Sequence, residues 1–230
     1  MVQKGSRAET TGAARRRRGR PRAYDPEAAL RRATQAFWTT GYSATTLDDL
    51  AAATGMNRPS LYAAFGDKRA LYLKALERYW QLSYAGMHEA LAYDRPLDEA
   101  LMRVFHKALS LYFPTGGAGR GCFAIGTATT EAVADPKIRA AFAEGLRRLD
   151  ASFEERIRVA RDAGELGREA DPAALAKLAS ATLHTIALRA RAGMPRAELE
   201  ELARQAVTAI VGRTGSGIEP NASDARQSIG

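Results

Sequence analysis

TLDDLAAATGMNRPSLYAAF, residues 46–65, reads as two short helices joined by a tight turn around Gly55. Thr46 suits the N-cap of the first helix, with Asp49 three residues later in the pattern of a capping box, and Asn57 suits the N-cap of the second. Gly55 supplies the left-handed backbone that ends many helices. This layout is typical of a helix-turn-helix, which places its second helix in the major groove of DNA.

Most of the chain's positive charge lies directly upstream. Residues 1–22 carry eight basic side chains against one acidic side chain, whereas the whole chain has a formal net charge of +8. Such a patch attracts a polyanion and makes binding depend on salt. The arginines expected to contact DNA phosphates are Arg16, Arg17, Arg18 and Arg20. A nuclear-import tag, a solubilising tail or an RNA-binding arm are the other interpretations of such a run.

The tetrapeptide Arg18-Gly19-Arg20-Pro21 resembles the core of an AT-hook. In that motif an extended chain lies in the narrow minor groove of A·T-rich DNA, where the negative potential favours arginine. We interpret the segment as a phosphate-binding arm that gains some A·T preference once DNA orders it.

Composition restricts the class of protein. The chain has 230 residues, 46% of them hydrophobic, and one cysteine, so it cannot form an internal disulfide. The first residues lack the apolar region of a secretory signal, and no stretch approaches the roughly 18 apolar residues of a membrane span. We therefore expect a cytoplasmic protein without a membrane partner.

Helical signals recur along the whole length, and no useful stretch alternates with period two. Asp-Pro pairs at Asp25, Asp135 and Asp171 combine an N-cap with a proline suited to the first turn. The predicted fold is all-α with about nine helices, over residues 26–40, 46–54, 57–65, 67–92 with an interruption near Gly86, 97–113, 122–134, 137–163, 171–191 and 196–211. The predicted organisation is a flexible basic arm (1–24), a helix-turn-helix domain (25–80), a regulatory and dimerisation domain (81–212) and a disordered tail (213–230).

Residues 25–80 resemble the DNA-binding domain of the tetracycline repressor (TetR) family of bacterial regulators. The resemblance depends on Phe37, Gly41-Tyr42, Thr45-Thr46, Leu50-Ala51, Gly55-Met56, Ser60-Leu61-Tyr62, Phe65, Lys68 and Leu71-Tyr72. The rest of the chain is similar in length, in helix number and in the Gly121-Cys122-Phe123 start of its central helix.

The resemblance implies a recognition helix that exposes Arg58, Pro59, Ser60, Tyr62 and Ala63 to DNA. Arg58 is the residue best able to read a base, because a guanidinium can donate two hydrogen bonds to guanine; a plain phosphate contact is the alternative. Four residues stand where family members hold phosphates: Thr46, Ser60, Tyr62 and Lys68. The Tyr62 ring could instead pack in the domain core.

The resemblance also implies a homodimer formed by the last two helices, which would bring two recognition helices to a near-palindromic double-stranded DNA operator. The expected interface consists of Leu175, Leu178, Thr182, Ile186, Leu199, Leu202, Ala206 and Ile210. These stripes could equally be core within one chain, because periodicity does not separate the two.

An effector pocket is implied between the helices of the regulatory domain. Its candidate residues are Met87, Leu101, Phe105, Leu109, Tyr112, Cys122, Phe123, Ile125 and His184, which favour an apolar or aromatic small molecule. Effector binding would shift the protein to a state with weaker operator affinity. Taken singly, most of these residues fit ordinary core positions.

Cys122 suggests a different trigger. A helix N-terminus lowers the pKa of a thiol, and Arg120 lies two residues before it, so an electrophile- or redox-sensing repressor is an alternative. A small buried hydrophobic residue is the plainer interpretation.

Nothing in the sequence predicts an enzyme. The three histidines form no H-E-x-x-H motif, the single cysteine forms no C-x-x-C, and the glycine-rich stretch 116–121 lacks the ending of a phosphate-binding loop. We predict no cofactor and no metal site. The expected protein is a DNA-binding transcriptional regulator, a repressor released by a small molecule, with an architectural A·T-rich DNA binder as the further alternative.

Overall fold

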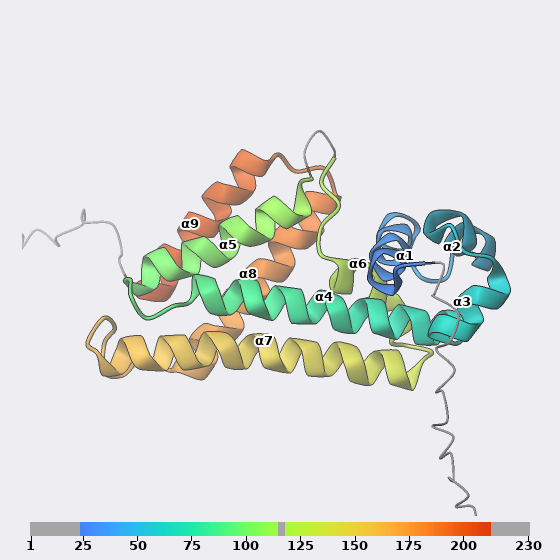
Figure 1. Cartoon of the computed structure of the whole chain (residues 1–230). Helices are drawn as coiled ribbons and strands as arrows, with labels where there is room; N and C mark the ends of the chain where they lie inside the picture. Colours follow the sequence, from blue (N-terminus) through green and yellow to red (C-terminus); the bar gives the residue numbers. More distant parts are fainter. Residues whose placement is uncertain (1–23, 115–117, 213–230) are drawn as a thin grey trace, which may run out of the picture.

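The computed structural model describes residues 24–114 and 118–212, and within them it contains helices and no strand (Figure 1). The helices are α1 Pro26–Thr40, α2 Leu47–Thr54, α3 Arg58–Phe65, α4 Lys68–Ala90, α5 Leu97–Tyr112, α6 Phe123–Glu131, α7 Pro136–Asp162, α8 Pro172–Arg191 and α9 Arg196–Val211. The predicted all-α fold is confirmed. Residues 1–23 of the predicted arm, which include Arg16, Arg17, Arg18 and Arg20, and the predicted tail lie outside the described residues.

Side-chain caps explain why most helices begin where they do. Six described helices start after a residue whose side chain accepts a hydrogen bond from the first turn: Asp25, Thr46, Asn57, Asp67, Asp135 and Asp171. The capping box of α2 is complete, because the Thr46 hydroxyl accepts from the Asp49 amide at 3.1 Å and the Asp49 carboxylate accepts from the Thr46 amide at 2.8 Å. Local chemistry thus sets the boundaries that the sequence predicted.

Two predicted boundaries need correction. Helix α4 runs unbroken through Gly86 to Ala90, because one interior glycine costs a helix only about 1 kcal/mol and buried Trp80 and Met87 anchor both sides of it. Helix α6 ends at Glu131 instead of Ala134, and residues 132–134 form the turn that leads to the Asp135 cap of α7.

Helices α1–α3 form one end of the molecule, and α4 leads from them along the remaining helices (Figure 1). Helix α7 lies beside α4, α8 packs against α7 and α9, and α5 packs against α4 and α9. An aromatic cluster joins α1, α4 and α6: the Phe37 ring of α1 meets Tyr72 of α4 edge-on with centroids 5.3 Å apart, and Tyr72 lies 5.8 Å from Phe123 of α6. No described helix is both long enough and apolar enough to span a membrane.

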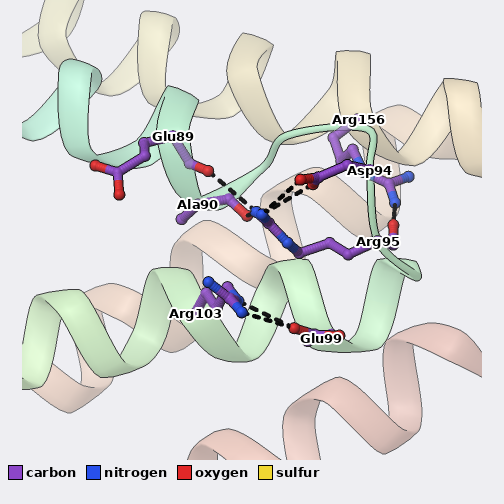
Figure 2. Close-up of polar contacts among 7 residues, drawn as sticks. All are labelled: Glu89, Ala90, Asp94, Arg95, Glu99, Arg103 and Arg156. Carbon is purple, nitrogen blue, oxygen red and sulfur yellow. Dashed lines mark hydrogen bonds and ion pairs between the residues drawn. The ribbon is translucent and has the colours of Figure 1, made fainter.

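Polar contacts tie the connection between α4 and α5 to the end of α4 and to α7 (Figure 2). Arg95 donates to the carbonyls of Glu89 and Ala90, both at 3.1 Å, and so satisfies acceptors that the end of α4 leaves free. The guanidinium of Arg156, only 2% exposed, donates to the Arg95 carbonyl at 2.7 Å. The connection between α4 and α5 is therefore held by α4 on one side and by α7 on the other.

Candidate DNA-binding surface and effector cavity

Helix α3 divides into a buried and an exposed face. Leu61 and Phe65 pack in the core, whereas Arg58, Pro59, Tyr62 and Ala63 are exposed and Ser60 is partly exposed. Tyr62 keeps 48% of its surface accessible, so the alternative of a core position for its ring does not hold. The five residues expected on the DNA-facing side thus lie together on one accessible surface.

Arg58 does not stand free on that surface. Its Nε donates to Asp48 Oδ1 at 2.7 Å, and its Nη2 donates to Asp48 Oδ2, so the two side chains form a two-point ion pair between the starts of α3 and α2. The hydrogen bond from Arg58 lowers the pKa of Asp48. Sequence reasoning missed Asp48, because the approach of two residues ten positions apart depends on the angle between the helices.

The two phosphate-contact candidates outside α3 are also engaged within the chain. The Thr46 hydroxyl donates to Asp49 Oδ2 at 2.7 Å as part of the cap. The Lys68 ammonium lies 4.5 Å from the centroid of the Tyr42 ring and donates to the Ser43 carbonyl at 3.3 Å. Burial lowers the pKa of Lys68. Both residues border the loop between α1 and α2, at one edge of the α2–α3 unit.

A cavity of about 320 Å³ lies where α1, α4, α5, α6, α7 and α8 meet. Of the residues predicted for an effector pocket, Met87, Tyr112, Cys122, Ile125 and His184 line it. Leu101, Phe105, Leu109 and Phe123 are not among its lining residues; they are fully buried in the core. Helical periodicity finds the inward face of a helix, but it cannot show which inward residues border a void.

The aromatic walls of the cavity come largely from residues that the sequence did not single out. Trp38 of α1 and Tyr79 and Trp80 of α4 line it. All three rings lie in residues 25–80, which the sequence attributes to the DNA-binding domain, so they were not predicted for the effector pocket. Both tryptophans of the chain therefore face one cavity.

Cys122 occupies the N-cap of α6, but its surroundings reverse the expected effect on the thiol. It is 8% exposed, and its sulfur lies 3.0 Å from the Tyr79 hydroxyl. Burial raises the pKa of the Cys122 thiol, and hydrogen bonds from neighbouring groups offset only part of this. The expectation of a lowered pKa is wrong, because removal from water outweighs the helix terminus. Arg120 stacks instead on Trp38, with its guanidinium carbon 3.8 Å from the ring centroid.

His184 supplies a polar atom without a partner. Its Nε2 is buried and forms no hydrogen bond within the described residues, and burial lowers the pKa of the imidazole. A neutral imidazole can donate or accept. Trp80 Nε1 is also buried and without a hydrogen bond among the described residues, so two lining residues carry an unpaired polar atom. Among residues 24–114 and 118–212, no three His, Cys, Asp or Glu side chains are grouped as metal ligands.

The cavity borders α1, at the end of the molecule that holds α2 and α3. Thr34 and Trp38 of α1 line it, and Trp38 Nε1 donates to the Gly121 carbonyl at 3.2 Å, next to Cys122. The hydroxyls of Tyr72 and Thr127 share a second contact, 2.7 Å long, between α4 and α6. A molecule in the cavity would therefore contact the helix that supports α2 and α3.

The candidate interface stripes are mostly covered within one chain. Thr182, Ile186, Leu199 and Ile210 are buried, so the intramolecular interpretation holds for these four. Leu178 is exposed, and Leu175, Leu202 and Ala206 are partly exposed. The burial of these four residues follows from packing, because α8 and α9 pack against each other and against α5 and α7.

Comparison with known proteins assigns both parts of the chain. Residues 29–75 match the family described as bacterial regulatory proteins, tetR family, and residues 99–207 match the tetracyclin repressor-like C-terminal domain. The HTH-type transcriptional repressor ComR of Escherichia coli (strain K12) is 30% identical over 204 residues, covering 88% of this chain and 95% of ComR. The chain belongs to the tetR family of bacterial regulatory proteins.

Other relatives agree with this assignment. The HTH-type transcriptional repressor BdcR of the same organism is 36% identical over 107 residues, 46% of this chain and 54% of BdcR. The solved structure of the TetR family regulator CifR, a cysteine mutant complexed with 26-bp double-strand operator DNA, superposes with a TM-score of 0.76 at 28% identity, covering 83% of this chain and 99% of CifR. This TetR-family chain is thus a transcriptional regulator with a helix-turn-helix as its DNA-binding element.

Proposed function

We propose that this regulator represses transcription by binding a near-palindromic operator as a homodimer, and that a small apolar or aromatic effector releases it. The observation that carries the operator half is the exposed face of α3, where Arg58, Ser60, Tyr62 and Ala63 are accessible while Leu61 and Phe65 hold the helix to its domain. The likeness to CifR, which was solved on operator DNA, supports the same use of this face.

A two-fold dimer is required for such an operator, because it sets two recognition helices about 34 Å apart. Helix α8 offers a suitable surface. The α8 stripe is defined as Leu178, Ala181, Thr185 and Leu188, which follow one another at helical spacing. The chain leaves Leu178, Ala181 and Leu188 exposed and covers Thr185 only in part. Leu178 is 44% exposed and Leu188 is 57% exposed. Apolar side chains of this size favour burial against a second copy.

Selection of bound genomic fragments by the purified protein at near-physiological salt tests the operator half. We expect enrichment of a short near-palindrome, and we expect Arg58→Ala to lose preference at one base pair in each half-site. Broad recovery of A·T-rich DNA without symmetry would contradict the proposal and would make the N-terminal arginines the main binder. The specificity ratio at fixed salt, not bare affinity, distinguishes the two.

The effector half is supported by the cavity, whose walls are aromatic and which includes Thr34 and Trp38 of α1. A ligand there gains apolar contacts from Trp80 and Tyr112 and can satisfy His184 Nε2. Such a ligand also contacts α1. A ligand that binds one conformation of the protein more tightly than another can therefore change the distance between the two recognition helices.

Both tryptophans line the cavity, so intrinsic fluorescence reports its occupancy. We expect neutral aromatic probes such as 1-naphthol to quench this fluorescence and to weaken binding to the selected operator. Ala108→Phe, which fills the cavity wall, should abolish both effects, whereas Ser110→Phe on the exposed side of α5 should leave them intact. Equal responses in the two variants would place the effector elsewhere.

A further inference from the structure

The ion pair between Arg58 and Asp48 lies on the exposed surface that faces the proposed operator, and folding stability does not explain it. Both side chains are more than half exposed, and pairs of this kind contribute little to the free energy of unfolding. Asp48 is not required as a cap either, because Asp49 closes the capping box of α2. The effect of the pair is therefore expected on the guanidinium itself.

The geometry of the pair determines which edge of Arg58 remains available. A guanidinium donates five N–H bonds along fixed directions. Asp48 accepts from Nε and Nη2, which form one edge of the group. The other edge, formed by Nη1 and the second hydrogen of Nη2, is left for another acceptor. Two parallel N–H donors at this spacing match O6 and N7 of guanine.

We propose that Asp48 is a positioning residue that holds Arg58 so that its free edge reads a guanine in each half-site of the operator. The inference rests on the proposed function, because it requires that α3 enters the major groove. A held arginine loses less side-chain freedom on binding than a free one. Asp48 also neutralises the charge of Arg58, which limits its attraction to phosphates at any sequence. Asp48 therefore increases the discrimination between base pairs and lowers the affinity for DNA of any sequence.

The test uses the full chain, with Asp48→Ala, Arg58→Ala and the double variant, on the operator selected by the wild type. The position read by Arg58 is the base pair at which Arg58→Ala loses preference. We expect Asp48→Ala to lower the preference for guanine there roughly tenfold, the order of one bidentate contact, while affinity for unrelated DNA rises. Preferences at the other base pairs should not change. In the double variant, loss of Asp48 should cause no further loss of preference.

The outcomes separate the inference from the proposed function. If wild-type protein selects a palindrome and Asp48→Ala raises affinity for all sequences with an unchanged guanine preference, Asp48 acts only through its charge and the positioning role is refuted. If the wild type selects no symmetrical site, the proposed function fails. Thermal unfolding of each variant followed by circular dichroism checks folding, and we expect little change because both side chains are exposed.

Discussion

At the scale of single residues, the surroundings of a side chain affect its pKa more than its position along a helix does, and Cys122 shows this most clearly. The thiol starts a helix, where a lowered pKa is expected, yet burial raises the pKa of Cys122, and the hydrogen bonds from Tyr79 and Tyr112 offset only part of the rise. The same thiol lines the cavity. A sensor role would therefore need a molecule small enough to enter the cavity and reactive towards a neutral thiol.

We predict that Cys122 reacts with iodoacetamide much more slowly in the native protein than in urea at pH 8. The raised pKa keeps the native thiol protonated where the unfolded thiol begins to ionise, towards its ordinary value of 9.0. For the same reason this residue stabilises the fold below pH 9 and loses that contribution as the pH rises further, because the unfolded state then releases a proton that the native state retains. Mass spectrometry of the only cysteine measures the rate unambiguously.

Cys122→Ser is the control for the labelling rate and for the pH dependence of the free energy of unfolding. It should show no labelling, and its free energy of unfolding should fall less steeply above pH 9 than that of the wild type. Native labelling as fast as labelling in urea would show an accessible thiolate, and would support the alternative of an electrophile-sensing repressor.

At the scale of helices, the sequence predicts starts and stops well and predicts neighbours poorly. The caps Asp25, Asp135 and Asp171 act within three residues of themselves, so a linear pattern is enough to find them. The interruption expected at Gly86 is absent, because it depends on what packs around α4. The same limit applies to Ile186 and Leu199, whose burial within the chain follows from the angles between helices and not from their spacing.

The candidate sites divide in the same way. The exposed face of α3 was predictable, because one amphipathic helix defines it. The partner of Arg58, the cavity walls at Tyr79 and Trp80, and the burial of Cys122 were not, since each brings together residues from different helices. Which residues of different helices meet is determined by three-dimensional packing, and the periodicity of a sequence does not report it.

Two helix-interior glycines should respond in opposite ways to the same substitution. A Cβ added at Gly86 of α4 would meet only Lys107 Cδ at 4.0 Å, whereas one added at Gly145 of α7 would overlap the Trp80 ring. We expect Gly86→Ala to raise the free energy of unfolding by about 0.5–1 kcal/mol, the helix propensity gain. Gly145→Ala should lower it by about 1–3 kcal/mol, because overpacking displaces Trp80.

Urea unfolding of the two variants beside the wild type measures both changes, and tryptophan emission reports on Trp80 directly. Each glycine serves as the control for the other, since the gain in propensity is common to them. Stabilisation by both substitutions would mean that α4 and α7 can separate at no cost, which would contradict their close packing.

At the scale of the whole molecule, the proposed homodimer needs an apolar surface that the chain's own packing leaves accessible. The α8 stripe is such a surface, because Leu178 and Leu188 remain accessible although α8 packs against α7 and α9. We predict that Leu178→Glu, and more strongly Leu178→Glu with Leu188→Glu, raises the dissociation constant of the dimer at least a hundredfold. An unpaired carboxylate in an apolar interface costs several kcal/mol, and about 1.4 kcal/mol is a factor of ten.

Sedimentation velocity across a range of concentrations measures this dissociation constant, and operator affinity should fall with it, because a monomer contacts one half-site only. Val133→Glu is the matched control: Val133 is 78% exposed, lies in the turn between α6 and α7, and gains the same charge away from the stripe. A Leu178→Glu protein that stays dimeric and binds the operator as the wild type does would place the two-fold axis on another face. Loss of operator binding without loss of the dimer would instead show that α8 transmits the state of the cavity to α1, whose Trp38 borders the same space.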